Sequence, residues 1–108
     1  MKIRLRADIR AAMKDGRQDE TKLFRALVAA IDNAEAPPAR QESSTPVQFQ
    51  SGAAEVERLV LSRSDVAQVL QAAISEREHA ALEFERLGRM DHAGSLRTEA
   101  HLAKRYVE

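Results

Sequence analysis

The chain of 108 residues contains no cysteine and no tryptophan, and it has only one tyrosine and three phenylalanines. The lack of cysteine excludes disulfides, thiolate zinc sites and a cysteine nucleophile. The sequence has no apolar run near the roughly 18 residues that a membrane span requires, and its N-terminus lacks a signal-peptide core. We therefore expect a cytoplasmic protein without a membrane partner, folded as one domain over residues 1–108.

Charge is balanced over the whole chain but not along it. The chain has seventeen basic and seventeen acidic residues, so the formal net charge is zero. The first 14 residues nevertheless carry five basic side chains and a single acidic one, Asp8. Neutrality argues against a dedicated nucleic-acid-binding protein, and we expect no DNA partner. The average still leaves room for a local contact with RNA through the N-terminal segment.

Apolar residues recur with helical spacing in four segments, at residues about 3–15, about 19–36, 65–87 and 91–107. Pro37 and Pro38 end the second segment, because proline disfavours helix in the residue before it. Residues about 37–58 have no helical period and are rich in serine and glutamine, which predicts an irregular loop. The fold class is therefore all-α, a four-helix domain of two helical hairpins joined by a long loop.

Several residues mark the expected helix ends. Gly16 and Gly88 follow the first and third helical patterns, where a left-handed C-terminal cap is favoured. Ser62 and Asp65 fit a capping box at the start of the third helix. Asp19 and Asp91 are predicted to be the N-caps of the second and fourth helices.

Four basic residues recur every four positions in the first helix and form one stripe: Lys2, Arg6, Arg10 and Lys14. Such a stripe can contact an RNA backbone, which requires positive charge but carries no sequence code. It can equally be the flank of a helix whose long side chains cover the edge of the core. The scarcity of aromatic residues argues against recognition of single-stranded bases.

Arg77 falls within the apolar stripe of the third helix, where an unpaired charge would be costly. We expect it to form an ion pair with Glu35 or Glu99, each of which lies at the edge of another helix's apolar face. The alternative is that Arg77 anchors an anionic ligand in a pocket.

No pattern in the sequence indicates catalysis, a cofactor or a metal. There is no Gly-x-Ser-x-Gly turn and no glycine-rich phosphate loop. His92 and His101 are nine residues apart and face opposite sides of a helix, and His79 belongs to another helix. We therefore expect no catalytic residues, no cofactor and no metal site.

The order of these segments resembles the YqeY-like family, also called the GatB/YqeY domain. The resemblance covers all of the chain except roughly residues 37–58. Its most specific stretch is Glu83-Phe84-Glu85-x-Leu87-Gly88-Arg89-x-Asp91-x-Ala93. Earlier parts include Leu23-Phe24-Arg25 and Leu61-Ser62-x-x-Asp65-Val66, and the pattern continues through Glu99-Ala100 to Tyr106.

The resemblance implies a helical relative of the C-terminal region of the B subunit of tRNA-dependent amidotransferases. Members of the family are commonly assigned carbon–nitrogen ligase activity with glutamine as amido-N-donor, although this region holds no known catalytic residues. The family pattern continues past the tyrosine into a second helical subdomain, whereas this sequence stops at Glu108.

We therefore expect a non-catalytic accessory module whose candidate partners are tRNA, an amidotransferase or another translation protein, with RNA contacts mainly on the first helix. The competing interpretation is a helical protein–protein adaptor or a homo-oligomer with no role in RNA binding.

Overall fold

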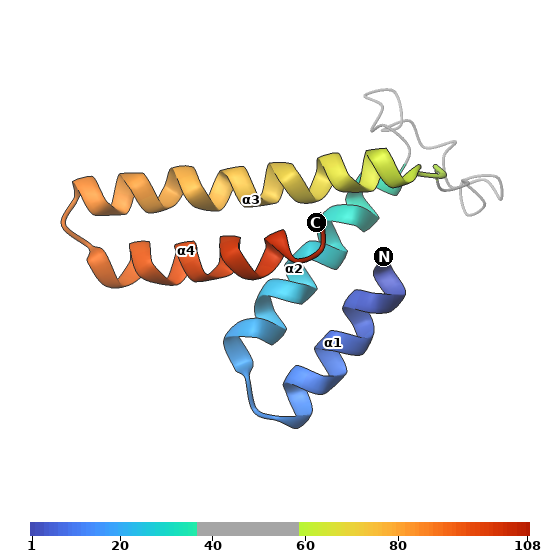
Figure 1. The fold of residues 1–108 in the computed structure, drawn as a ribbon, viewed down its shortest axis with the longest axis horizontal. Helices are drawn as coiled ribbons and strands as arrows, with labels where there is room; N and C mark the ends of the chain where they lie inside the picture. The colour runs from blue at the N-terminus through green and yellow to red at the C-terminus, as the bar shows by residue number, and fades with distance from the viewer. Residues whose placement is uncertain (37–58) are drawn as a thin grey trace, which may run out of the picture.

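The chain folds into four helices, as the computed structural model in Figure 1 shows. The structure describes residues 1–36 and 59–108, so the predicted loop at residues 37–58 lies outside the described residues. The helices are α1 (Lys2–Lys14), α2 (Gln18–Glu35), α3 (Arg63–Arg86) and α4 (Met90–Lys104). The described ranges contain no strand, and the all-α class expected from the sequence is confirmed.

Neighbouring helices in the sequence pack side by side, α1 with α2 and α3 with α4. α2 also contacts α3 and α4, near the C-terminal end of α4. The opposite end of the α3–α4 pair, at the turn that joins the two helices, projects beyond α1 and α2 (Figure 1). Helices α3 and α4 therefore have one end in the shared core and one end outside it.

The turns after α1 and α3 have the same hydrogen-bonding pattern. Gly16 and Gly88 have φ of +74° and +77°, in the left-handed region that glycine adopts readily. The N–H of the residue after each glycine donates to a carbonyl five residues earlier: Arg17 to Ala12 at 2.8 Å and Arg89 to Phe84 at 2.8 Å. This pattern is a Schellman motif, and it satisfies helix-end carbonyls while it reverses the chain.

The N-cap predictions were right for α3 and wrong for α2 and α4. Ser62 accepts a hydrogen bond from the backbone N–H of Asp65, and Asp65 accepts one from the N–H of Ser62, each at 3.0 Å. Arg17 and Arg89 occupy the N-caps of α2 and α4, without a side-chain cap hydrogen bond. After each Schellman turn the residue that follows the glycine is the N-cap, and the next helix begins two residues after the glycine.

Asp19 and Asp91 consequently lie in the first turns of α2 and α4 rather than at the caps. A carboxylate in the first turn still interacts favourably with the positive end of the helix dipole. The two aspartates therefore favour the helix starts through charge, without supplying the cap hydrogen bond.

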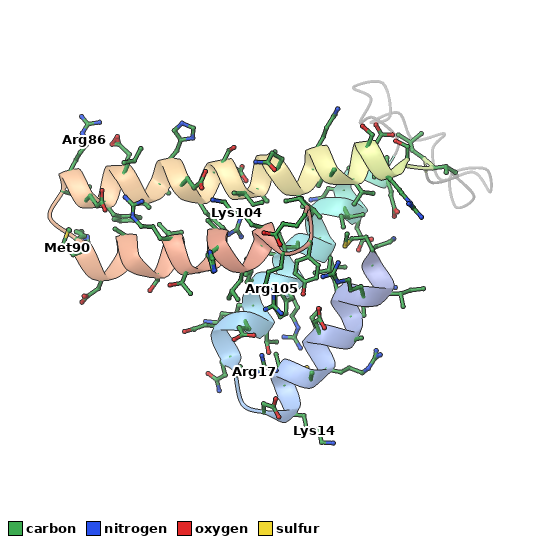
Figure 2. The ribbon with its side chains drawn as sticks, in the orientation of Figure 1. Lys14, Arg17, Arg86, Met90, Lys104 and Arg105 are labelled. Carbon is green, nitrogen blue, oxygen red and sulfur yellow. The ribbon has the colours of Figure 1, made fainter. Side chains whose placement is uncertain are left out.

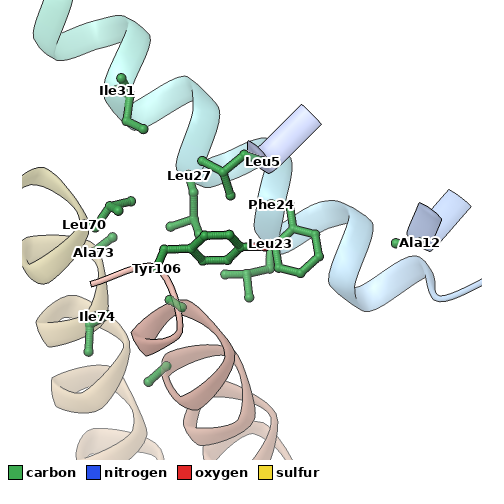
Figure 3. Close-up of a cluster of buried hydrophobic side chains, with 12 residues drawn as sticks. Leu5, Ala12, Leu23, Phe24, Leu27, Ile31, Leu70, Ala73, Ile74 and Tyr106 are labelled. Carbon is green, nitrogen blue, oxygen red and sulfur yellow. The ribbon is translucent and has the colours of Figure 1, made fainter. Parts of the chain in front are cut away.

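Leucine, isoleucine, alanine and two aromatic rings form the core between the helix pairs (Figure 3). Its largest fully buried side chains are Leu5, Leu27, Ile31, Leu70 and Ile74. Tyr106, just beyond α4, adds its ring to this core and lies edge-on to Phe24, with ring centroids 5.7 Å apart. The tyrosine ring therefore packs the C-terminal end of the chain against α2.

Candidate nucleic-acid interface

The basic stripe of α1 lies opposite the face that enters the core. Leu5 and Ala12 are completely buried, whereas Arg6, Arg10 and Lys14 are exposed. Figure 2 shows Lys14 at the end of α1 next to the turn, with its side chain pointing away from the ribbon. The periodicity of α1 thus separates an apolar face from a cationic one.

Lys2, the first residue of the stripe, is tied to α2 instead of facing solvent. Its Nζ lies 2.6 Å from Glu35 Oε1 and 3.0 Å from Asp32 Oδ1. The hydrogen bonds to Glu35 and then Asp32 raise the pKa of Lys2 above its usual range. Lys2 therefore fastens the start of α1 to the end of α2, and its charge is compensated there.

The other three cations of the stripe differ from Lys2. Within residues 1–36 and 59–108, no carboxylate forms an ion pair with Arg6, Arg10 or Lys14. By contrast, Arg17 in the adjoining turn pairs with Glu20 at 2.5 Å and with Asp15 at 3.1 Å. The positive charge of the three stripe residues is therefore available to an external anion.

Two cations of α2 join this surface, and sequence reasoning missed both. Lys22 and Arg25 are exposed, and neither has an ion pair with another described residue. An Arg25 guanidinium nitrogen lies 3.4 Å from the sulfur of Met13, which brings it to the side of α1. Only the packing of α2 against α1 shows that Lys22 and Arg25 lie beside Met13, the residue that precedes Lys14. We call the combined set the hairpin basic surface: Arg6, Arg10, Lys14, Lys22 and Arg25.

An open hollow of about 330 Å³ lies next to the α1–α2 turn, where it meets the part of the hairpin basic surface that Lys22 and Arg25 form. Ala12, Met13 and Thr21 line it together with Lys22 and Arg25. The Thr21 hydroxyl donates to the carbonyl of Arg17 at 3.0 Å, so its hydrogen-bonding demand is met within α2. The hollow therefore combines apolar side-chain surface with two cations.

Arg77 has the carboxylate partner that its position requires. Its Nε lies 3.0 Å from Glu99 Oε1, and its guanidinium also donates to the carbonyl of Ala73 at 3.0 Å. The side chains of Arg77 and Glu99 are 17% and 33% exposed, so solvent screens the pair only in part. Glu35, the other expected partner, binds Lys2. The pair joins α3 to α4, as the structural interpretation of Arg77 requires.

The histidines do not come together. His79 Nδ1 lies 3.0 Å from the carbonyl of Ser75 in its own helix, and His92 stacks on Phe84 with ring centroids 4.8 Å apart. In the part of the chain that the structure describes, no three histidine, aspartate or glutamate side chains are grouped to hold a metal ion. Likewise, none of the described helices has the length and apolarity needed to cross a lipid bilayer.

The chain matches no protein-family model, no curated protein and no solved structure.

Proposed function

We propose that this chain is a non-catalytic accessory module of the YqeY-like kind, which contacts the phosphate backbone of tRNA through the hairpin basic surface. The observation that carries the proposal is the contrast between Lys2, which is neutralised by Asp32 and Glu35, and Arg6, Arg10 and Lys14, which lack carboxylate partners among the described residues. Uncompensated cations release counterions from a nucleic acid on binding, whereas a neutralised lysine does not.

The proposal assigns no reaction to the chain. The resemblance to the amidotransferase-associated region suggests a role near tRNA amidation, in which glutamine serves as amide donor to a larger enzyme. In that setting the module binds and positions the tRNA, while another protein carries out the amidation.

Replacement of Arg6, Arg10 and Lys14 by glutamine tests the proposal. Affinity for unmodified tRNA is measured by fluorescence anisotropy between about 50 and 200 mM salt. We expect a loss of at least tenfold at the low-salt end, and a salt slope smaller by about two to three, because each lost phosphate contact removes close to one from the slope.

A matched control removes three positive charges from the other helix pair. Arg86, Arg97 and Lys104 are exposed, and each forms an ion pair within α3–α4. Their replacement by glutamine should leave the salt slope unchanged. Equal effects of the two triple variants, or no binding of tRNA at low salt, would overturn the proposal.

A second candidate, a protein–protein adaptor, is favoured by the exposed apolar side chains at the projecting end of α3–α4. Leu82, Leu87 and Met90 are 52%, 70% and 61% exposed. Affinity purification of the tagged chain, with both RNA and protein identified, separates the two functions. A defined protein that is lost in a Leu87→Ser, Met90→Ser double variant, with no bound RNA, would support the adaptor.

A further inference from the structure

We infer that the hollow beside Met13 and Arg25 receives the base of one unpaired nucleotide, while the surrounding cations hold the flanking phosphates. This inference rests on the proposed function, since it takes RNA as the partner of the hairpin basic surface. It adds a preference that a row of charges alone cannot create: RNA with an unpaired nucleotide should bind more tightly than continuous duplex.

The described residues that line the hollow include no aromatic side chain on which a base could stack, in keeping with the few aromatic residues of the chain. The lining suits a flat aromatic ring through two other groups, a thioether and a guanidinium. Met13 presents a polarisable thioether, which makes favourable contacts with aromatic rings, and its side chain is 55% exposed. Arg25 presents a planar guanidinium, a group that stacks on nucleobases. A volume of about 330 Å³ is far more than the space of a single bound water, so a ring has room to enter.

Cations that can bind phosphates lie in the lining of the hollow and on the adjoining part of α1. Lys22 lines the hollow, and Lys14 and Arg10 lie on α1 beside Met13, the latter one helical turn away. Arg25 contacts the sulfur of Met13, and it has no ion pair with a described carboxylate. One nucleotide thus accounts for both the apolar surface and the cations at its edge.

An acidic peptide with a single aliphatic anchor would use some of the same features. An aliphatic anchor, however, gains less from the thioether and the planar guanidinium than an aromatic ring does. The arrangement therefore favours the nucleotide, and the peptide becomes one arm of the test.

The test compares two synthetic RNAs with the same number of phosphates, a continuous duplex and a duplex with one bulged nucleotide. At equal salt we expect the bulged RNA to bind about tenfold more tightly, the combined scale of a sulfur–ring contact and a guanidinium stacked on a base. A 2-aminopurine at the bulge should change its fluorescence on binding.

Two variants address the hollow. Met13→Ala removes the thioether surface, and Arg25→Lys keeps the charge but removes the planar group. Both should reduce the preference for the bulged RNA to less than about threefold, with duplex affinity nearly unchanged. Met90→Ala is the matched control, because Met90 is a similarly exposed methionine, in α4 at the projecting end of the α3–α4 pair; it should retain the full preference.

The outcomes separate this inference from the proposed function. Equal, salt-dependent binding of the two RNAs would overturn the base-binding hollow and leave the backbone contact standing. No binding of either RNA at low salt would overturn both. Met13-dependent binding of an acidic leucine-containing peptide, without RNA binding, would assign the hollow to a protein partner and refute the inference.

Discussion

Tyr106 offers a sharp test of how the C-terminal end of the chain is held. Its side chain is 6% exposed, its ring lies edge-on to Phe24, and its hydroxyl donates to Asp8. The guanidinium carbon of Arg4 lies 4.6 Å from the ring centroid. One side chain thus connects the segment after α4 to both α1 and α2.

We expect Tyr106→Phe to lower the free energy of unfolding by about 1–2 kcal/mol. A hydrogen bond to a charged group contributes about 1.5–3 kcal/mol. Because Asp8 is half-buried, a water molecule can replace part of the lost hydrogen bond in the variant. For a chain of this size the loss corresponds to a Tm lower by roughly 4–10 °C. Tyr106→Ala also removes the buried ring and should cost about 3–5 kcal/mol.

The phenol can be observed directly, because Tyr106 is the single tyrosine of a chain without tryptophan. Burial, and then the hydrogen bond to Asp8, raise the pKa of Tyr106 above its usual value. The folded state therefore binds the phenol proton more tightly than the unfolded state does. The resulting stability is fully present below a pH of about 10 and is lost as the pH rises above it towards the folded-state pKa.

Urea unfolding at increasing pH, followed by circular dichroism, should show a steeper loss of stability above a pH of about 10 in the natural chain than in Tyr106→Phe. In Asp8→Asn, tyrosinate absorbance should appear at lower pH than in the natural chain but still above the ordinary range, because burial is the larger cause. Titration of the natural chain near pH 10 with its helices intact would refute the reasoning.

Two further predictions concern the α3–α4 pair. Arg77→Met should cost about 2 kcal/mol in urea unfolding, because it leaves the partly buried Glu99 carboxylate without its partner, and the double variant with Glu99→Met should recover most of this loss. Unchanged stability of Arg77→Met together with loss of RNA binding would instead favour the anion-anchor role. Ser62→Ala removes one half of the capping box and should lower the unfolding free energy by about 1 kcal/mol. Ser64→Ala, two residues later in the first turn of α3 and without a cap hydrogen bond, should change it little. Equal effects would contradict the capping role.

Local signals in the sequence were enough for most of the secondary structure. The glycines after α1 and α3 and the Ser62–Asp65 capping box are short-range features, so their residues identify them without knowledge of packing. The predicted N-caps of α2 and α4 were wrong because a Schellman turn leaves only one residue between its glycine and the next helix. That residue, an arginine in both cases, is the N-cap. Asp19 and Asp91 lie two residues after these arginines, so their preference for the N-cap position could not move the start of either helix.

The candidate site was only partly accessible from the sequence. The spacing of Arg6, Arg10 and Lys14 placed them on one face of α1, and the structure keeps that face exposed. The same spacing included Lys2, whose neutralisation depends on carboxylates some thirty residues away. Lys22 and Arg25 carry no periodic signal, so their place beside Met13 depends on the antiparallel packing of α2 on α1.

The sequence by itself therefore determined the class of the fold. The absence of cysteine excludes a disulfide framework, and the 3.6-residue apolar period predicts packed amphipathic helices. It also determined which segments become helices, since helix periodicity and the turn glycines act over a few residues. Only the tertiary structure decided which charges are neutralised, because ion pairs such as Lys2–Glu35 and Arg77–Glu99 join different helices. The uncompensated cations around the hollow are what remains once those pairs have formed.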